Sequence, residues 1–567
     1  MARDNDGKLQ KAVRDGKDDD GVSWEHAISE LNRQQTIIRT PNPSDQGHTR
    51  QKQAGKLWVW ERLVSLLDKD SFSEVGSVSG KPVVDEKTGE VVSFTPANIV
   101  IGWGKVAGRK VFVTADDFSV RGGHADGGIA GKAAYGEELA RKMKVPLIRL
   151  LDGSSGGGSV ATYLAMGATY VPPLAGLGQS MESLAVVPVA SALLGPVVGL
   201  AAAKAVTSHF SVMVKDLSQL FAAGPPVVKQ ATFEDLSKEA LGGWEVHSSN
   251  GTIDNVATSE LDAFLQIRTF LSYLPSSVFA LPPVISSTDP AERREEELVG
   301  IIPRRRGRAY DIRKVIRLIV DGGSEESGGS SFFEMGATWG RPIVTGLARL
   351  SGRTVGVLSS DCMVNGGAID ALGSQKTARF VNLCDHFSIP LLNLVDQPGF
   401  AIGSAAEKSA TIRHGASAMS ALYDATVPIF TVIIRRAFGV AGGAFADPED
   451  GRNFRVAWPS GDWGSLPLEG GIEAAYKRQL EKAESEGGPP AREKMMKDLL
   501  AKFEEVRSPV KTANKFGIEE IIDPRDTRPT ACDWAVHAYE NLLPQRLVAK
   551  QSIFGVEGRS KGRGYKL

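Results

Sequence analysis

Short, strongly apolar segments alternate along the chain with polar or amphipathic stretches that are long enough for helices. In the first half, two strand-like segments joined by a Gly-Arg turn precede a helical stretch and two apolar strands, at 99–117, 131–144, 146–152 and 186–194. The same order returns in the second half, at 343–361, 374–387, 390–396 and 427–434. Strands that alternate with helices of this length predict α/β domains whose helices pack outside the sheets.

The two halves are copies of one another. Residues Ile99–Asp152 align without a gap to Ile343–Asp396, at an offset of 244 residues, and 19 of the 54 paired positions are identical. The identical positions include the Gly-Arg turns and the aspartate that ends each first apolar strand. A period of this length predicts two homologous domains rather than a solenoid.

The repeat sets the predicted domain boundaries. We expect a helical or flexible N-terminal extension, two domains and a basic tail, at 1–54, 55–300, 301–550 and 551–567. In the extension, the pattern predicts a helix at Trp24–Gln35 and a Pro/Ser loop at Pro41–Gln53. Two charged surface helices are predicted at Glu473–Glu486 and Ala491–Val506, because the Gly-Gly-Pro-Pro sequence between them breaks a helix.

One segment, Leu184–Ala203, runs for 20 residues without a charge, which is long enough to cross a bilayer. The alternative is a buried strand, a turn and the start of a helix. Proline and glycine interrupt the segment, which favours the alternative. The 244-residue offset also pairs Gly195 with Gly439 and Gly199 with Gly443, so the twin of this segment contains two arginines. A membrane helix with such a twin would imply two arginines in lipid at the matching place, so no membrane span is expected.

Composition narrows the function classes. The 66 Lys and Arg residues balance 67 Asp and Glu residues, so no basic field indicates nucleic-acid binding. The three cysteines are far apart and form no CxxC pair, which excludes a disulfide scaffold and a cysteine-built zinc site and is typical of a reducing compartment. The first 35 residues are hydrophilic and rich in aspartate, unlike a signal peptide or an acid-poor transit peptide. We expect a cytoplasmic protein, with the mitochondrial matrix as the alternative if the sequence given lacks a transit peptide.

Glycine is the exceptional residue, with 62 copies gathered in clusters. Four glycine-rich turns follow apolar strands and precede helices, at 154–159, 195–203, 396–404 and 438–445. A helix N-terminus leaves backbone N–H groups unsatisfied, and glycine lets a ligand approach them. Phosphate binding, oxyanion stabilisation and simple packing turns all stay open. The sequence has no GxxxxGK[ST] motif and no dinucleotide fingerprint in register, and matched turns in two homologous domains favour an oxyanion.

The sequence contains few motifs that would indicate catalysis by side chains. There is no GxSxG elbow, and no HxxxH or HExxH spacing suggests a metal site. His124 and His414 lie beside glycine loops, where a hydrogen-bonded structural histidine is the alternative to a catalytic one. The run Arg304-Arg305-Arg306 is either a phosphate contact or a solvated linker turn. An enzyme with oxyanion holes and no general base needs its base from the substrate or a cofactor.

Several co-linear motifs between about Gly55 and Val548 are specific at the level of a family: GKLWVWERLVSLLDKDSF, IIPRRRGRAYDIRKVI, ARFVNLCDHFSIPLLNLVDQPGF, IRHGASAMSALYDATVPIFTVIIRRAFG and FGIEEIIDPRDTR. With these motifs the sequence resembles the carboxyltransferase β subunits of biotin-dependent acyl-CoA carboxylases, such as those for propionyl-CoA and methylcrotonyl-CoA. The resemblance implies two tandem crotonase-like domains and a hexameric ring, built as a dimer of trimers. It also implies active sites between the N-terminal domain of one subunit and the C-terminal domain of another.

The resemblance further implies a mechanism that explains the missing base. Carboxybiotin releases CO₂, its ureido anion takes the α-proton of the acyl-CoA, and the enolate attacks CO₂ at the α carbon or a vinylogous position. Two backbone oxyanion holes hold the thioester enolate and the carbonyl oxygen of biotin. By motif position, these catalytic holes fall at Gly199-Leu200 and Val440-Ala441. The implied substrate-binding residues are Gly156, Gly157, Gly442, Gly443, Pro398, Gly399 and Phe400.

The sequence departs from the family pattern at the site. Ser159 lies in a longer first-domain loop where relatives of the propionyl type have an arginine. Gly443 stands at the position that bears on acyl choice in those relatives. The missing side chain predicts a wider or differently shaped acyl pocket.

No Met-Lys-Met biotinylation hairpin is present, since Met495-Met496-Lys497 lies in a charged helical pattern, and no ATP-binding glycine loop is evident. The sequence therefore predicts a partner with biotin carboxylase and biotin carrier functions. Two alternatives remain at this point. One is a subunit of a biotin-dependent decarboxylase or transcarboxylase, and the other is a catalytically altered structural paralogue in a carboxylase ring.

Overall fold

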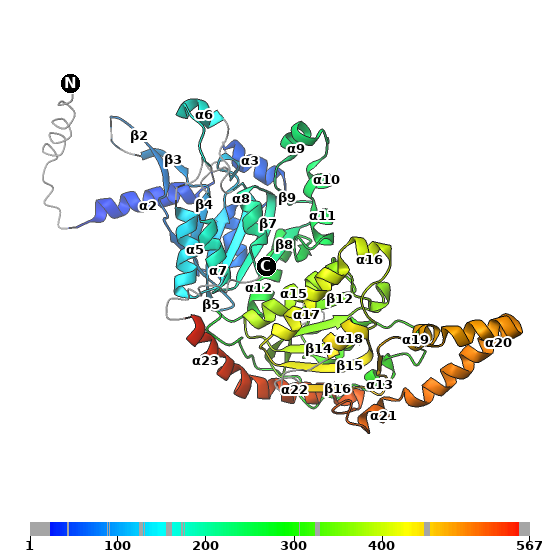
Figure 1. Ribbon diagram of the computed structural model, residues 1–567. Coiled ribbons are helices and arrows are strands. Elements are labelled where there is room, and N and C mark those ends of the chain that lie inside the picture. The colour runs from blue at the N-terminus through cyan, green and yellow to red at the C-terminus, as the bar shows by residue number, and fades with distance from the viewer. Residues whose placement is uncertain are drawn as a thin grey trace.

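The computed structural model describes residues 23–41, 45–87, 89, 91–123, 129, 131–154, 161–171, 174, 176–305, 307–323, 329–446 and 454–554. Two α/β units lie side by side, each built on its own central sheet (Figure 1). The predicted fold class is confirmed, and so is the duplication.

The N-terminal sheet has eight strands: β1 (Ser73–Val75), β4 (Ile99–Val106), β5 (Arg109–Asp116), β6 (Leu147–Gly153), β7 (Val189–Val198), β8 (Phe210–Val214), β9 (Gln219–Phe221) and β10 (Asn255–Ala257). They run in the order β1-β4-β5-β6-β7-β8-β10, and β9 pairs with the end of β7. Strands β4 and β5 form the predicted antiparallel pair, and β5 to β8 are parallel. A separate hairpin consists of β2 (Gly80–Val84) and β3 (Val91–Pro96).

The C-terminal sheet repeats this plan with β11 (Phe333–Met335), β12 (Ile343–Leu350), β13 (Arg353–Ser360), β14 (Leu391–Gln397), β15 (Ile429–Phe438), β16 (Phe454–Ala457) and β17 (Asp462–Gly464). The order is β11-β12-β13-β14-β15-β16, and β17 pairs with the end of β15 as β9 does with β7. Strands β6 and β14 are buried along their whole length, which their continuous apolar sequences require of central parallel strands.

Each half also contains helices. In the N-terminal half they are α4 (Val59–Leu66), α5 (Lys132–Met143), α6 (Ala161–Met166), α7 (Leu177–Leu184), α8 (Leu200–Val206), α9 (Pro225–Thr232), α10 (Lys238–Gly242), α11 (Trp244–Ser249) and α12 (Glu260–Tyr273). In the C-terminal half they are α13 (Glu297–Ile301), α14 (Ile312–Ile319), α15 (Ala371–His386), α16 (Ser404–Lys408), α17 (Thr411–Asp424), α18 (Gly439–Ala446), α19 (Leu468–Ala475), α20 (Lys477–Val506), α21 (Pro509–Ala513), α22 (Thr527–His537) and α23 (Leu543–Phe554). Helix α15 begins where the Asp370 side chain accepts from the N–H of Gly373, and α5 and α15 both end before the proline that introduces the next strand.

The register of the repeat changes between the first and second apolar strands. Leu147 of β6 pairs with Val189, whereas its counterpart Leu391 of β14 pairs with Ile429. The offset is therefore 244 residues up to the first strand and 240 after it, because the connection in the first domain is four residues longer. The predicted pairing of Gly195 with Gly439 and of Gly199 with Gly443 is wrong. The structure pairs Gly199 with Gly439 and Gly195 with Arg435.

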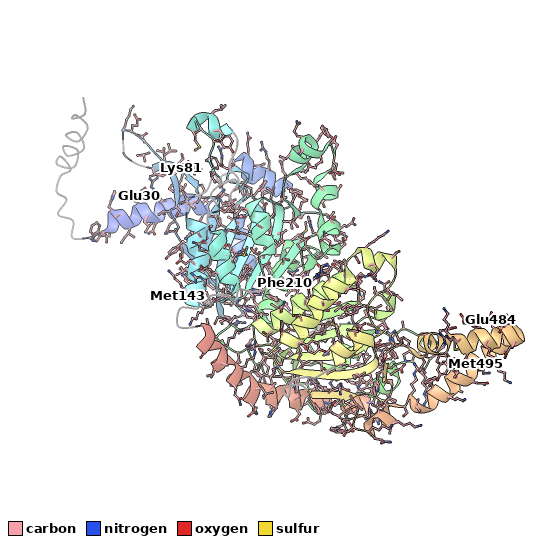
Figure 2. All side chains as sticks on the ribbon, viewed as in Figure 1. Glu30, Lys81, Met143, Phe210, Glu484 and Met495 are labelled. Carbon is pink, nitrogen blue, oxygen red and sulfur yellow. The ribbon has the colours of Figure 1, made fainter. Side chains whose placement is uncertain are left out.

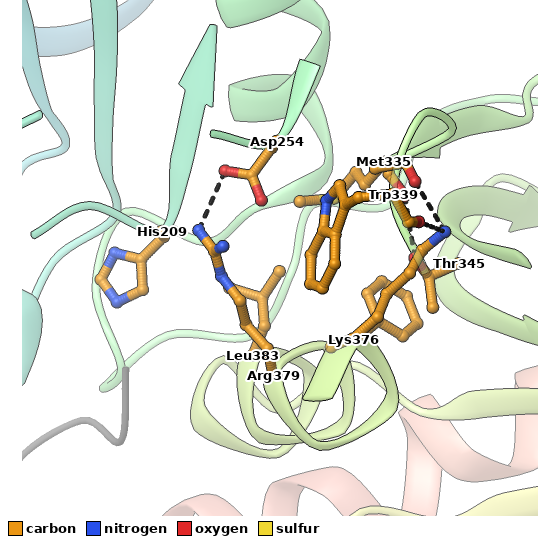
Figure 3. Close-up of a pocket in the computed structure, with 10 residues that line it drawn as sticks. His209, Asp254, Met335, Trp339, Thr345, Lys376, Arg379 and Leu383 are labelled. Carbon is orange, nitrogen blue, oxygen red and sulfur yellow. Dashed lines mark hydrogen bonds and ion pairs between the residues drawn. The ribbon is translucent and has the colours of Figure 1, made fainter. Parts of the chain in front are cut away.

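A shared hydrophobic core joins the two units. Phe210, which Figure 2 labels between them, stacks on Phe270 and meets Phe333 edge to face. Across the same junction, Arg379 of α15 donates to Asp254 at 3.1 Å, and the ring of His386 stacks on that of His209. Figure 3 shows this junction from close range.

Lys376 of α15 is buried at this junction with three backbone acceptors, the carbonyl oxygens of Gly336, Trp339 and Ile343, at 2.7, 3.1 and 2.7 Å (Figure 3). Burial lowers the pKa of Lys376 to about 7. The three carbonyls match the three donors of an ammonium group, so this lysine fastens the turn between β11 and β12 to helix α15.

The N-terminal segment and the charged helices near the C-terminus agree only in part with the elements predicted for them. The N-terminal helix is α2 (Glu25–Arg39), longer than predicted, and the expected loop over Pro41–Gln53 contains helix α3 (Gln46–Gln53), which the Asp45 side chain caps. The charged pair of helices forms the projection on which Figure 2 labels Glu484 and Met495, with the predicted break at Gly488, whose φ is +71°. Most of the basic tail lies outside the described residues.

The charge-free segment folds as the buried strand β7 followed by the start of α8. No helix in the described part of the chain is long and apolar enough to cross a membrane. All strands of the two large sheets fall inside 73–257 and 333–464. The predicted domain boundaries stay a prediction.

Candidate active site

Three turns meet at the carboxyl ends of the parallel strands in the C-terminal domain. They follow β13 (365–370), β14 (397–401) and β15 (438–443). The N–H of Ile369 donates to the carbonyl oxygen of Gly399 at 3.1 Å, and that of Ala401 donates back to Ile369 at 2.9 Å. A Cβ atom on Gly399 would stand 3.8 Å from the carbonyl oxygen of Phe438. Ligands of open α/β sheets bind at this edge, so the convergence marks the candidate site.

Asp396 is the buried anchor of these turns. Its carboxylate accepts hydrogen bonds from two adjacent arginines of β15, Arg435 at 2.7 Å and Arg436 at 2.6 Å. Tyr310 donates its hydroxyl to the same carboxylate at 3.0 Å. Burial alone would raise the pKa of Asp396, but the hydrogen bonds from Arg436 and Arg435 outweigh it and hold that pKa below its usual range. Arg436 also donates to the carbonyl oxygen of Gly366 at 2.7 Å, which ties all three turns to one ionised carboxylate.

Asp152 holds the equivalent place in the N-terminal domain, with different cations. Lys56 approaches it at 2.5 Å and Arg62 at 2.9 Å, both from the segment that precedes the sheet. The strand register places Gly195 where the second domain has Arg435. A Cβ atom on Gly195 would stand 2.1 Å from Oδ1 of Asp152 and 2.4 Å from Nζ of Lys56. The glycine is therefore what makes room for the lysine.

The predicted donors of the N-terminal domain lie at the start of α8. Gly199 is exposed at φ +64°, and no heavy atom lies within 4 Å of a Cβ atom built on it. Its N–H is directed at the carbonyl oxygen of Phe221 at 3.4 Å, the long limit of a hydrogen bond. The N–H of Ala201 donates to the carbonyl oxygen of Ser154 at 3.2 Å. Leu200 lies between them at the first helical position, whose N–H has no intrahelical acceptor.

The predicted donors of the C-terminal domain lie at the start of α18. Gly439 has φ +63°, which matches Gly199. Val440 corresponds to Leu200 by register and has a side chain 69% exposed, whereas Ala441, one residue further, is fully buried. The predicted pairs Gly199-Leu200 and Val440-Ala441 are therefore offset by one residue in the repeat.

Gly442 and Gly443 continue the first turn of α18 in opposite environments. A Cβ atom on Gly442 would stand 2.5 Å from the carbonyl carbon of Ala437, so this glycine is a packing requirement. Gly443 is exposed, with no heavy atom within 4 Å of a built Cβ atom. The space that a side chain would occupy at Gly443 is open.

Of the remaining predicted residues, some lie in a described turn and the others lie outside the described residues. Pro398, Gly399 and Phe400 form the half-buried turn after β14, and the Phe400 ring packs against Gly415, where a Cβ atom would stand 2.5 Å from it. Gly156, Gly157, Ser159 and His124 lie outside the described residues.

Sequence reasoning missed the groups that hold the turns in place. Lys56, Arg62, Tyr310 and the ion-pairing role of Arg435 were not predicted as part of the site. The available signal was the repeated aspartate at the end of an apolar strand, because a buried carboxylate requires a counter-charge. Within the described ranges, no group of three or more His, Cys, Asp or Glu side chains has an arrangement that could hold a metal ion.

Comparison with known proteins gives the context of this site. Residues 50–548 match the carboxyl transferase domain family. The propionyl-CoA carboxylase carboxyltransferase subunit of Haloferax mediterranei is 34% identical over 485 residues, which covers 84% of this chain and 89% of that protein. The α subunit of methylmalonyl-CoA decarboxylase from Veillonella parvula is 32% identical over 507 residues, with 88% and 93% covered.

Solved structures agree with the sequence relatives. The transcarboxylase 12S hexamer, with methylmalonyl-CoA and methylmalonic acid bound, superimposes with a TM-score of 0.77 at 29% identity, over 91% of this chain and 96% of that one. A single-chain, multi-domain long-chain acyl-CoA carboxylase shares the fold, with a TM-score of 0.74 at 23% identity, over 91% of this chain and 50% of that one.

Proposed function

The chain belongs to the carboxyl transferase family and is an enzyme of the acyl-CoA carboxylase class, and from that premise we propose that it transfers CO₂ from carboxybiotin to the α carbon, or the vinylogous position, of an acyl-CoA. The observation that carries the proposal is the matched pair of turns. Gly199 and Gly439 both have a positive φ, +64° and +63°, at equivalent strand ends, each at the start of a helix. In this proposal, one turn stabilises the enolate oxygen of the thioester and the other stabilises the carbonyl oxygen of biotin, because both oxygens become negative in the reaction.

The backbone of these turns fits such ligands. The exposed Gly199 and the open space at Gly443 let a planar carbonyl group approach the helix starts without meeting a side chain. The proposed donors are the N–H groups of Gly199-Leu200 in one hole and of Val440-Ala441 in the other. Preorganised donors of this kind stabilise a developing oxyanion by about 2.7–4 kcal/mol each. At Gly199 the donor must exchange its long bond to Phe221 for the ligand.

The buried aspartates position the donors. Asp396 with its two arginines fixes the turn after β14 relative to the turn after β15, and Asp152 with Lys56 and Arg62 does the same in the other domain. Both carboxylates are held in buried ion pairs. In this proposal neither of them is the base that removes the α-proton. Bound carboxybiotin supplies both the CO₂ and the base that removes the α-proton. The chain itself holds the enolate oxygen and orients the α carbon.

The acyl pocket lies beside α18 in this proposal. Gly443 leaves open space next to the exposed Val440, so we propose that the pocket accepts an acyl group wider than propionyl. We propose that Pro398, Gly399 and Phe400, in the turn after β14, line the same cleft.

The assembly is proposed on the same premise. The transcarboxylase 12S relative is a hexamer, and we propose a hexameric dimer of trimers here, with each site between the N-terminal domain of one subunit and the C-terminal domain of another. A biotin carboxylase and biotin carrier subunit completes the enzyme. The three cysteines are buried and unpaired, which supports a reducing compartment such as the cytoplasm.

The test is a transfer assay with purified protein and a carboxybiotin donor against a series of acyl-CoAs. The proposal predicts carboxylated acyl-CoA for at least one of them, and co-purification with an ATP-dependent biotin carboxylase. Decarboxylation without such a partner would assign the chain to the decarboxylase or transcarboxylase alternative. No turnover with any acyl-CoA in either direction would leave the structural ring subunit as the correct interpretation.

A further inference from the structure

Strand β6 of the first domain and strand β14 of the second carry a polar residue at the same place. Arg149 of β6 pairs with Ser191 of β7, and Asn393 of β14 pairs with Thr431 of β15. The Arg149 side chain is fully buried, and Asn393 is 2% exposed. The flanking residues of both strands are apolar, so a polar group at this place is an exception that needs partners.

Each of these two side chains donates to the carboxyl end of the helix that begins with a proposed oxyanion hole. Asn393 donates to the carbonyl oxygen of Phe445 at 2.6 Å, one residue before α18 ends. Arg149 donates from Nη1 to the carbonyl oxygens of Lys204 and Thr207, at 3.0 and 2.7 Å, at the end of α8. The last carbonyl groups of a helix lack intrahelical partners, so both side chains supply donors that the helices need.

The charge of Arg149 is balanced by a network that the first domain alone contains. Glu137 of α5 accepts from Arg149 at 2.8 Å, and Lys204 of α8 lies 3.3 Å from the same carboxylate. The repeat places the buried Val381 and Ala444 where the first domain has Glu137 and Lys204. The fold of the domain therefore does not require these charges, whereas both domains keep a donor that reaches the helix end.

Asn393 is not the residue that stability alone would select. Its Oδ1 atom is buried and has no hydrogen-bond partner among the described residues. A buried acceptor without a partner costs free energy, which an apolar side chain of similar shape would avoid. Its Nδ2 group, by contrast, donates to both the carbonyl oxygen of Phe445 and the hydroxyl of Thr431. The amide is thus placed for its donor, and the donor is directed at α18.

From these contacts we propose that Asn393 and Arg149 are positioning residues for the two oxyanion holes. The inference rests on the proposed function and names the side chains that set the donors at Val440-Ala441 and at Gly199-Leu200. Neither side chain touches a reacting atom in this proposal. Each one acts through the helix that it holds against its strand.

A short helix carries a displacement at its carboxyl end to the donors at its start. Val440 and Phe445 are five residues apart in α18, about 7.5 Å along the helix axis. Loss of the donor of Asn393 leaves α18 free to shift against β14, which lies beside it (Figure 1). A misplacement of about 1 Å at a reacting centre lowers a rate about 100-fold.

The experiment compares Asn393→Leu with Tyr539→Phe in the complete enzyme. Leucine resembles asparagine in shape but donates no hydrogen bond. Asn393→Leu is expected to lower kcat about 10- to 100-fold and to leave KM for the acyl-CoA within a few-fold. Its melting temperature should change by less than about 5 °C, because removal of the unpartnered Oδ1 offsets the lost bond to Phe445.

Tyr539→Phe is the matched control for a lost buried hydrogen bond. The Tyr539 hydroxyl is buried and donates to the carbonyl oxygen of Thr354 at 2.8 Å, at the start of β13 and therefore at the sheet edge opposite the site. This variant should keep the kcat of the unchanged enzyme. Because each substitution removes one donor to one backbone carbonyl, a difference in kcat between them reports the place of the contact.

Arg149→Met tests the same role in the first domain. It removes the donors to α8 and leaves Glu137 paired with Lys204, and it should lower kcat about 10- to 100-fold. Arg149→Asn places the second domain's side chain at the equivalent position, so it should recover part of this loss. Hydrogen exchange without substrate should be faster in α18 of Asn393→Leu and in α8 of Arg149→Met than in the unchanged protein.

An unchanged kcat in folded Asn393→Leu would overturn the inference, and so would a loss of kcat that disappears when the assay temperature is lowered. The latter result would assign Asn393 to stability alone. Because hydrogen exchange needs no turnover, the two proposals fail separately. Faster exchange in these helices, in a protein that carboxylates no acyl-CoA, would refute the proposed function and support the helix contacts. Normal turnover and unchanged exchange in the variants would refute only the positioning role.

Discussion

Gly195 lies against Asp152 so closely that a Cβ atom on the glycine would stand 2.1 Å from Oδ1 of the aspartate. The same atom would stand 2.4 Å from Nζ of Lys56. Gly195→Ala must therefore displace a buried ion pair, and we expect it to lower the free energy of unfolding by about 1–3 kcal/mol. Urea unfolding at a fixed protein concentration measures the change.

The matched control for this substitution is Gly178→Ala in helix α7. No heavy atom lies within 4 Å of a Cβ atom at that position, and alanine favours a helix over glycine by about 0.5–1 kcal/mol. Gly178→Ala should leave stability unchanged or raise it. An equal loss in both variants would show that Gly195 has no special role beside the ion pair.

Asp396→Asn is expected to be more costly, because it leaves two arginines without their common anion. Arg435 is only 4% exposed, so its charge has no access to solvent. Removing one partner of a buried ion pair costs about 3–5 kcal/mol. Thermal unfolding measures this loss. Asp235→Asn, which breaks the exposed pair with Lys229, should change stability by less than about 1 kcal/mol. A small effect at Asp396 would refute its role as the anchor of the three turns.

The histidine pair at the domain junction predicts acid sensitivity. Burial lowers the pKa of His386 from its usual 6.5 to about 3, and burial and the neighbouring His386 also depress the pKa of His209. The unfolded chain therefore binds more protons than the folded chain below pH 6.5. Stability is complete above that pH and decreases as the pH falls toward 3, by up to about 1.4 kcal/mol per pH unit for His386, and His209 adds a loss in the same direction.

The control is His386→Gln, measured between pH 6.5 and 5, where most carboxylates remain ionised. The amide nitrogen of glutamine can take the place of Nε2 of His386, which contacts the carbonyl oxygen of Leu184 at 3.0 Å. Averaged over this range, the slope of unfolding free energy against pH should decrease by about 1 kcal/mol per unit. An unchanged slope would exclude His386 as a source of the pH dependence.

The open space at Gly443 predicts a change in acyl selectivity. Gly443→Leu places a side chain in unoccupied space on α18, where leucine also favours the helix, so the fold should be retained. The ratio kcat/KM should fall at least about 10-fold for acyl-CoAs longer than propionyl-CoA and stay within a few-fold for acetyl-CoA. An equal loss for all chain lengths would place the acyl group elsewhere.

The sequence predicted most of the fold because its signals were redundant. The apolar strands, the Gly-Arg turns and the ungapped repeat all indicated the same α/β domain, and the strands form where they were predicted. Helix α3 was missed because its sequence, QGHTRQKQ, has no apolar periodicity. The register beyond Asp396 was misassigned because glycines recur every few residues in these turns, and only strand pairing separates an offset of 244 from one of 240.

The candidate site was predictable at the level of segments but not of contacts. Glycine clusters after strands located the helix starts at Gly199 and Gly439. The partners of Asp152 could not be inferred, because Lys56 and Arg62 lie about 90 residues before it and only the folded chain brings them together. The offset of one residue between the two predicted donor pairs likewise emerges only from the strand register.

The most direct test of the account compares Val440→Pro with Val440→Ala in the acyl-CoA carboxylation assay. Val440 follows Gly439 at the start of α18, where proline is tolerated, and its side chain is 69% exposed, so both variants should fold. Proline removes the backbone N–H, whereas alanine keeps it. We predict that Val440→Pro lowers kcat about 10²- to 10³-fold while Val440→Ala stays within a few-fold of the unchanged enzyme. Equal activity of the two variants would contradict an oxyanion hole built from this backbone.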